Sequence, residues 1–206
     1  LDGTLIDSRQ DLAFSVNEAR KEFNLEPLPQ EKVVSYVGNG IHKLVERAFF
    51  RTGIDSAQAL KVLKNIYSSH LLDATSTYPG VREGLEIISS ANFAIVVVSN
   101  KMQRESIEIL NGLGVGGFFS LILGDNGDLK LKPDPEMIFY VRDYLKIPLD
   151  NSWIIGDNWT DLECGRRAGI KKAFASYGFG KQKDEKYDFN ADSFIKFAEM
   201  LRSIAR

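Results

Sequence analysis

The chain has 206 residues, of which 44% are hydrophobic and 26% are charged. This balance is typical of a protein with a buried core, and the length suits one large domain or one domain with an insertion. The net charge of −2, without a block of like charges, argues against a nucleic-acid partner. The single cysteine, Cys164, excludes an internal disulfide framework and fits a reducing compartment. The longest apolar run, residues 93–98, is too short to span a bilayer, so we expect a cytoplasmic protein without a membrane partner.

Residues 9–75 are expected to be almost wholly helical. Apolar residues recur there at helical spacing in four segments, and Pro27, Pro29, the Gly38–Gly40 loop and Gly53 interrupt them. Ser8 is expected to cap the first of the four helices. The predicted helices cover residues 8–23, 30–36, 41–50 and 56–71.

From residue 78 onward, predicted helices alternate with short β-rich runs. The run 93–98 has no polar alternation, which is typical of a strand buried on both faces of a parallel sheet. Further strands are expected at 119–123, 153–155, 173–175 and 191–193, and further helices at 81–91, 103–113, 135–145, 161–168 and 195–205. This alternation predicts an α/β fold with a doubly wound, mostly parallel Rossmann-like sheet.

The first eight residues resemble the end of a buried strand that turns into a loop. A strand at the start of the chain belongs with the sheet predicted after residue 78, so the helical segment between them interrupts one unit. We therefore expect a Rossmann-like core made of residues 1–8 and 76–206, with residues 9–75 as an inserted α-helical cap.

Polar side chains occur where the predicted strands end. Ligands of open parallel sheets bind at the carboxyl ends of the strands, so we expect these side chains to converge. A hydroxyl and backbone amides can bind phosphoryl oxygens, a lysine can neutralise their charge, and carboxylates can hold Mg²⁺. The pattern therefore predicts a phosphate and divalent-metal site. Its candidate residues are Asp2, Ser99, Asn100, Lys132, Asp157 and Asp161.

Each of these residues also has an ordinary structural interpretation. Ser99 and Asn100 can form a turn, and Lys132 can be a surface lysine before a proline. Asp157 and Asp161 can cap the helix that follows them. Only the joint order of the residues along the chain favours a site over these alternatives.

Four segments together resemble the haloacid dehalogenase superfamily. They are Asp-Gly-Thr-Leu-x-Asp-Ser at 2–8, Ser-Asn after a strand at 99–100, Lys-Pro-x-Pro at 132–135 and Gly-Asp-x-x-x-Asp at 156–161. The helical insertion after the first segment resembles the subclass with a small α-helical cap. Segments 36–48, 78–81 and 177–178 resemble bacterial phosphoglycolate phosphatases.

The resemblance implies a Mg²⁺-dependent phosphatase that hydrolyses a small phosphomonoester, with 2-phosphoglycolate as a candidate, through an aspartyl-phosphate. The nucleophile of the family lies two positions before the residue that Asp2 matches, so we expect it just upstream of Leu1. Asp2 would be the general acid and base and would bind the metal through its carbonyl.

The resemblance assigns roles to the other motif residues. Lys132 would be catalytic and would bind the phosphoryl group, Asp157 would bind the metal, and Asp161 would orient the metal site or Lys132. The remaining phosphate-binding residues would be Thr4, Ser99 and Asn100.

The Gly38-Asn39-Gly40 loop precedes a predicted helix. Small residues at a helix N-terminus can bind an anion, so a substrate carboxylate can dock there, although a simple glycine turn explains the loop equally well. The resemblance favours the binding role. The neighbouring His42, Lys43 and Arg47 can contribute to binding or be solvated, and Trp159 is bulkier than the fourth motif leads us to expect.

Other functions stay open at this point. A sugar phosphomutase would need a cap that excludes water, and a phosphonate hydrolase would need a cap lysine such as Lys43 to form a Schiff base. A catalytically silent binding module is the third possibility, and Asp2, Lys132 and Asp157 argue against it. In each enzyme the expected partner is a small phosphorylated metabolite, and the protein can be a monomer or a homodimer.

Overall fold

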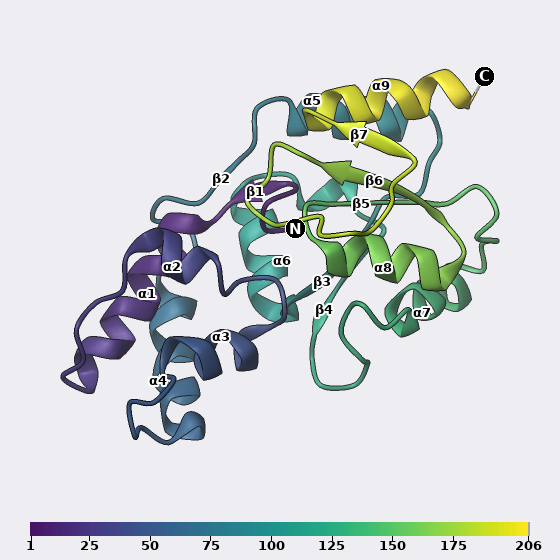
Figure 1. Cartoon of the computed structure of the whole chain (residues 1–206). Helices are drawn as coiled ribbons and strands as arrows, with labels where there is room; N and C mark the ends of the chain where they lie inside the picture. The colour runs from purple at the N-terminus through teal and green to yellow at the C-terminus, as the bar shows by residue number, and fades with distance from the viewer. Residues whose placement is uncertain (206) are drawn as a thin grey trace.

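The computed structural model describes residues 1–205 and contains two layers of helices around parallel strands, with four further helices to one side (Figure 1). The strands are β1 (Ile6–Asp7), β2 (Ser76–Thr77), β3 (Val96–Met102), β4 (Leu121–Asp125), β5 (Trp153–Gly156), β6 (Lys171–Ala175) and β7 (Phe189–Ala191). The four helices at the side are α1 (Arg9–Glu22), α2 (Gln30–Val34), α3 (Ile41–Ala48) and α4 (Ser56–Ser69). The others are α5 (Val81–Ser90), α6 (Gln103–Gly112), α7 (Glu136–Leu145), α8 (Trp159–Ala168) and α9 (Phe194–Ile204), with a 3₁₀ turn at Gly116–Phe118.

The strands after residue 90 pair in parallel. Strand β3 pairs with β4, and β5, β6 and β7 pair in that order. Helices α5 and α9 lie on one side of these strands, and α7 and α8 lie on the other (Figure 1). The alternation of parallel strands and helices confirms the predicted α/β, Rossmann-like fold.

The predicted strand at 93–98 is displaced in the structure. Strand β3 begins at Val96 and continues to Met102, with an irregularity in the pairing between Val98 and Met102. Ser99, Asn100 and Lys101, which were expected to follow the strand, are thus part of it. The Asn100 side chain forms hydrogen bonds with the backbone of Lys132 on a neighbouring loop. Val97 is buried but Val96 and Val98 are only half-buried, so the strand is not fully covered on both faces.

Two short strands were not predicted. In β1 and β2, Ile6 lies opposite Thr77 and Asp7 opposite Ser76, in an antiparallel pair. The chain passes through this pair on its way into helices α1–α4 and on its way back (Figure 1). The arrangement supports the proposed division into a core and a cap of residues 9–75.

A buried carboxylate joins the two crossings between these regions. Asp11, on α1, accepts hydrogen bonds from the Ala74 and Thr75 amides at 2.9 and 2.8 Å, and from the Thr75 hydroxyl at 2.6 Å. Hydrogen bonds to a charged acceptor are worth about 1.5–3 kcal/mol each. Asp11 thus stabilises the position of α1 relative to the segment that returns to the core.

Apolar side chains fill the interior of both regions. Val16, Val33, Val45 and Leu63 are buried among α1–α4, and burying one such side chain is worth about 1.5–3 kcal/mol. In the core, α5 packs closely on α9 through Gly84, where a Cβ would lie 2.6 Å from Cδ1 of Phe194. Within residues 1–205, no helix combines the length and apolarity that crossing a membrane requires.

Candidate active site

A cavity of about 270 Å³ lies between the carboxyl ends of the core strands and helices α3 and α4. It collects residues from the four motifs and from the glycine loop before α3. Such a volume is near the lower end for ligand sites and suits a small metabolite. The predicted residues that line it are Asp2, Gly38, Asn39, Gly40, Ser99, Asn100, Lys132, Asp157 and Asp161.

Thr4 is the one predicted phosphate-binding residue that the structure does not bring into this lining. Its side chain is buried, and its backbone carbonyl accepts a hydrogen bond of 2.6 Å from the Tyr177 hydroxyl. The Thr4 backbone is thus held by Tyr177, and its side chain lies outside the lining of the cavity.

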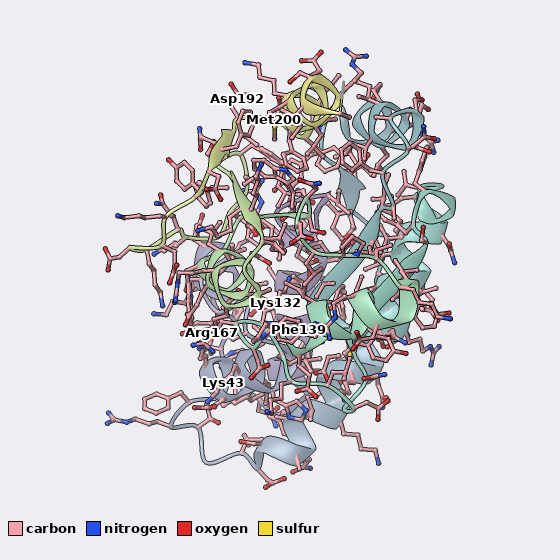
Figure 2. All side chains as sticks on the ribbon, turned by 90° about the vertical axis from the view of Figure 1, so that its right-hand side faces the viewer. Lys43, Lys132, Phe139, Arg167, Asp192 and Met200 are labelled. Carbon is pink, nitrogen blue, oxygen red and sulfur yellow. The ribbon has the colours of Figure 1, made fainter. Side chains whose placement is uncertain are left out.

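Lys132 is buried inside the molecule (Figure 2). Its Nζ donates hydrogen bonds of 2.6 Å to Oδ1 of Asp161 and to the Val98 carbonyl. The interpretation of Lys132 as a surface lysine is thus wrong. A buried charge is tolerated when it is paired and hydrogen-bonded, and Asp161 satisfies that requirement here.

Asp161 also caps helix α8, as the structural interpretation predicted. Its Oδ2 accepts from the Asn158 amide at 3.1 Å, and the Asn158 side chain accepts from the Thr160 amide at 3.3 Å. The N-cap of α8 is therefore Asn158, and the interpretation of Asp157 as the helix cap is wrong. With Asn158 as the cap, the Asp157 carboxylate is left to the cavity.

The Asp157 carboxylate is buried without a lysine partner. Burial, together with the negative charge of Asp161, raises its pKa to about 6. Its Oδ2 accepts from the Gly180 and Phe179 amides at 2.7 and 3.2 Å. Gly3 approaches the same oxygen so closely that a Cβ there would lie 1.8 Å away. A cation bound beside Asp157 would compensate the negative charge of this buried carboxylate.

Residues 1–205 hold no group of three His, Cys, Asp or Glu side chains that could bind a metal by themselves. Mg²⁺ does not require such a group, because it keeps several waters and is often bound through one or two carboxylates and the phosphate of the substrate. Asp157 and the backbone carbonyl of Asp2 fit this pattern. The residues present are therefore compatible with Mg²⁺.

Asp2 has two donors on one carboxylate oxygen. Its Oδ1 accepts from the Ser8 hydroxyl at 2.5 Å and from Nζ of Lys101 at 3.1 Å. Burial opposes ionisation, but the charge of Lys101 and the Ser8 hydrogen bond hold the pKa of Asp2 below its ordinary value. Ser8 occupies the N-cap position of α1, yet its hydroxyl does not cap the helix as predicted, because it binds Asp2 instead.

The glycine loop of the cap rests on the core. The Asn100 side chain donates to the Gly38 carbonyl at 3.0 Å, and Arg47 donates to the Asn39 side chain at 3.0 Å. Arg47 also lines the cavity, whereas His42 and Lys43 are not in its lining. Lys43 is exposed, pairs with Glu46 at 2.6 Å, and lies apart from Lys132 in Figure 2.

Sequence reasoning missed two parts of the lining. Lys101 directly follows the Ser99-Asn100 motif in β3 and lines the cavity with it, so its place next to the motif was the available signal. The loop with Phe179, Gly180, Lys181 and Lys183 carried no motif. It reaches the cavity because the Trp159 amide donates to the Lys181 carbonyl at 2.8 Å and Lys183 lies over the Trp159 ring.

A parallel α/β core with acids and a lysine at the carboxyl ends of its strands, covered by an inserted set of helices, is typical of enzymes with a Rossmann-like core and a helical cap. The sequence profile of the haloacid dehalogenase-like hydrolases matches residues 1–175. The chain belongs to this family.

Several named relatives are similar over nearly the whole chain. The phosphoglycolate phosphatase of Aquifex aeolicus is 34% identical over 92% of this chain and 88% of its own length. That of Haemophilus influenzae is 30% identical over 98% of this chain and 95% of its own. A crystal structure of a predicted phosphoglycolate phosphatase from Haemophilus somnus 129pt has a TM-score of 0.91 and 26% identity, covering 97% of this chain and 94% of that one. The chain thus resembles bacterial phosphoglycolate phosphatases, which are phosphoric monoester hydrolases.

Proposed function

We propose that this protein is a Mg²⁺-dependent phosphatase that hydrolyses a small phosphomonoester, with 2-phosphoglycolate as its first candidate substrate. The observation that carries the proposal is the meeting of Asp2, Lys132 and Asp157, from three distant segments, in one cavity. The names of the relatives at 30–34% identity support the choice of substrate. The buried free thiol of Cys164 is in keeping with a cytoplasmic location.

The proposal places the nucleophile on an aspartate directly before Leu1 in the full-length protein. Leu1 lines the cavity together with Asp2, Lys132 and Asp157, so a residue directly before Leu1 would lie at the same site. Uncatalysed phosphomonoester hydrolysis is extremely slow. Attack by a carboxylate would replace this one difficult step by the formation and hydrolysis of an aspartyl-phosphate.

Asp2 would serve as the acid and then as the base. Lys101 and Ser8 keep Asp2 ionised in the free site, so Asp2 would take up a proton as the anionic substrate enters. As the bond between phosphorus and the leaving oxygen breaks, the protonated Asp2 would give that proton to the leaving oxygen. The Asp2 carboxylate then takes a proton from the water that attacks the aspartyl-phosphate. The cycle returns Asp2 to its starting form and yields an alcohol and inorganic phosphate.

The other residues would stabilise charge on the transferring phosphoryl group. Lys132, held by Asp161, neutralises its oxygens, and the Ser99 hydroxyl donates to them. The Asn100 side chain already forms two hydrogen bonds of 2.8 Å with the backbone of Lys132. Asn100 would therefore donate to the phosphoryl group through its backbone N–H. Asp157 and the Asp2 carbonyl would hold Mg²⁺, which when bound neutralises phosphoryl charge.

The cap would select the substrate. The Gly38–Gly40 loop lines the cavity in contact with Asn100, and Arg47 adds a positive charge beside the loop. Backbone amides at the start of α3 together with Arg47 can bind a carboxylate. This arrangement suits a substrate that carries a carboxylate close to its phosphate.

The test is a hydrolysis assay of the full-length protein on a panel of phosphomonoesters, with Mg²⁺ or with EDTA. We expect Mg²⁺-dependent release of phosphate, with 2-phosphoglycolate among the preferred substrates, and a loss of activity in Asp157→Asn. Activity on sugar phosphates without activity on 2-phosphoglycolate would contradict the choice of substrate. Full activity in EDTA would contradict the role of the metal.

A further inference from the structure

Lys101 is a buried cation to which the proposed reaction gives no task. Its side chain is only 6% exposed, and it lines the same cavity as Asp2 and Ser99. Burying an ammonium group is unfavourable unless it is paired, and the partner of Lys101 is the Asp2 carboxylate at 3.1 Å. The lysine thus touches the proposed acid and base directly.

Lys101 is also held by the cap. Its Nζ donates to the hydroxyl of Tyr67, on α4, and lies 4.5 Å from the centre of the Tyr67 ring. The next residue of α4, Ser68, donates to the buried Glu105 of α6 at 2.9 Å. Two adjacent contacts therefore bring this end of α4 onto the core beside Asp2, and Lys101 is held between a core carboxylate and a cap phenol.

The two donors to Asp2 share one oxygen. Within residues 1–205, both hydrogen bonds to the carboxylate, from Ser8 and from Lys101, go to Oδ1. Two donors on one oxygen fix the rotation of the carboxyl group about its last bond. The other oxygen, Oδ2, is then the atom available for a proton transfer in the cavity.

We propose that Lys101, braced by Tyr67, is a positioning residue that holds Asp2 by Oδ1 so that Oδ2 serves the leaving oxygen of the substrate. This inference rests on the proposed function. Negative charge develops on Asp2 as it releases its proton, and the ammonium of Lys101 stabilises that charge in a site shielded from water. The contribution is needed only when the leaving group requires a proton.

This condition gives a test that a merely structural lysine would not pass. An alkyl phosphate such as 2-phosphoglycolate expels a strongly basic alkoxide that must be protonated, whereas p-nitrophenyl phosphate expels a stable phenolate. The experiment compares kcat/KM for both substrates in the full-length wild type and in Lys101→Met, because kcat/KM reports the step in which the leaving group departs. Asp2→Asn removes the proposed acid itself, so it shows how kcat/KM for each of the two substrates changes when general acid catalysis is lost.

We expect Lys101→Met to lower kcat/KM for 2-phosphoglycolate by about 100-fold and that for p-nitrophenyl phosphate by less than about threefold, since general acid catalysis contributes about 10²–10⁴-fold. Tyr67→Phe, which removes only one hydroxyl, should show the same selectivity in weaker form, about three- to tenfold. Lys196→Met makes the same substitution at an exposed lysine on α9 and should leave both values unchanged.

Equal losses on both substrates, or no loss on either, would overturn the role of Lys101 while leaving the proposed function intact. A wild type that hydrolyses neither substrate would overturn the proposed function, and the inference with it. If Lys101→Met does not fold, as judged by its thermal unfolding curve, the comparison is decided by Tyr67→Phe and by Lys101→Arg. The arginine variant keeps the charge and should retain most of the activity on 2-phosphoglycolate.

Discussion

The ammonium group of Lys132 lies 2.6 Å from a carboxylate oxygen of Asp161, and both side chains are buried. Lys132 lies in the loop before α7, and Asp161 lies in the first turn of α8. Both partners line the cavity together with Asp157, which has no lysine partner. The charge of Lys132 is thus compensated within the site, whereas that of Asp157 is not.

Lys132→Met should destabilise the protein as well as inactivate it. The substitution leaves the buried carboxylate of Asp161 without its partner, and removing one member of a buried ion pair costs about 3–5 kcal/mol. Urea unfolding followed by circular dichroism measures the change, with Lys196→Met as the exposed control. A variant that loses activity while keeping the stability of the wild type would show that the pair does not contribute to folding.

Mg²⁺ binding should weaken in acid because of Asp157. Its pKa is raised to about 6, so below that pH a proton occupies the carboxylate that the metal requires. Isothermal titration of the full-length protein with Mg²⁺ at pH 5, 6 and 7 should show affinity falling by about tenfold per pH unit below pH 6. Affinity that is constant from pH 5 to 7 would contradict the assignment, and Asp157→Asn should show only residual binding.

Gly3→Ala should damage the same carboxylate from the other side. A Cβ at Gly3 would lie 1.8 Å from Oδ2 of Asp157, and the φ of +74° is unfavourable for alanine. Gly53→Ala is the matched control, because its φ is +77° but no atom lies within 4 Å of the added Cβ. Both variants should lose about 1–2 kcal/mol of stability to backbone strain. Only Gly3→Ala should lose Mg²⁺ binding, and equal binding in the two variants would exclude the predicted displacement of Asp157.

The elements of the fold could be predicted from sequence better than their ends. Apolar spacing located α1–α9 because each helix buries one stripe, but it misplaced β3 by several residues. Asn100 pairs with the backbone of Lys132, and this tertiary contact keeps a polar stretch within the strand. The β1–β2 pair escaped prediction because two-residue strands carry no periodicity.

The candidate site could be predicted where its residues stand in ordered motifs. Asp2, Ser99, Lys132 and Asp157 meet in one cavity, as the order of the four segments suggested. The contacts that decide the role of each side chain could not be predicted from the sequence, because they form only when the whole chain has folded. Ser8 binds Asp2 instead of capping α1, and Lys101 acquires its place from Tyr67 in the cap.

The proposed function requires that catalysis proceed through a phosphorylated aspartate at the position before Leu1. The test quenches the full-length protein with acid during turnover and then reduces it with borohydride. Reduction converts a phosphorylated aspartate to homoserine, so peptide mapping by mass spectrometry locates the phosphorylated residue. We predict substrate-dependent conversion at the residue before Leu1 and none at Asp2. Conversion at Asp2, or hydrolysis without conversion of any aspartate, would contradict the proposed mechanism.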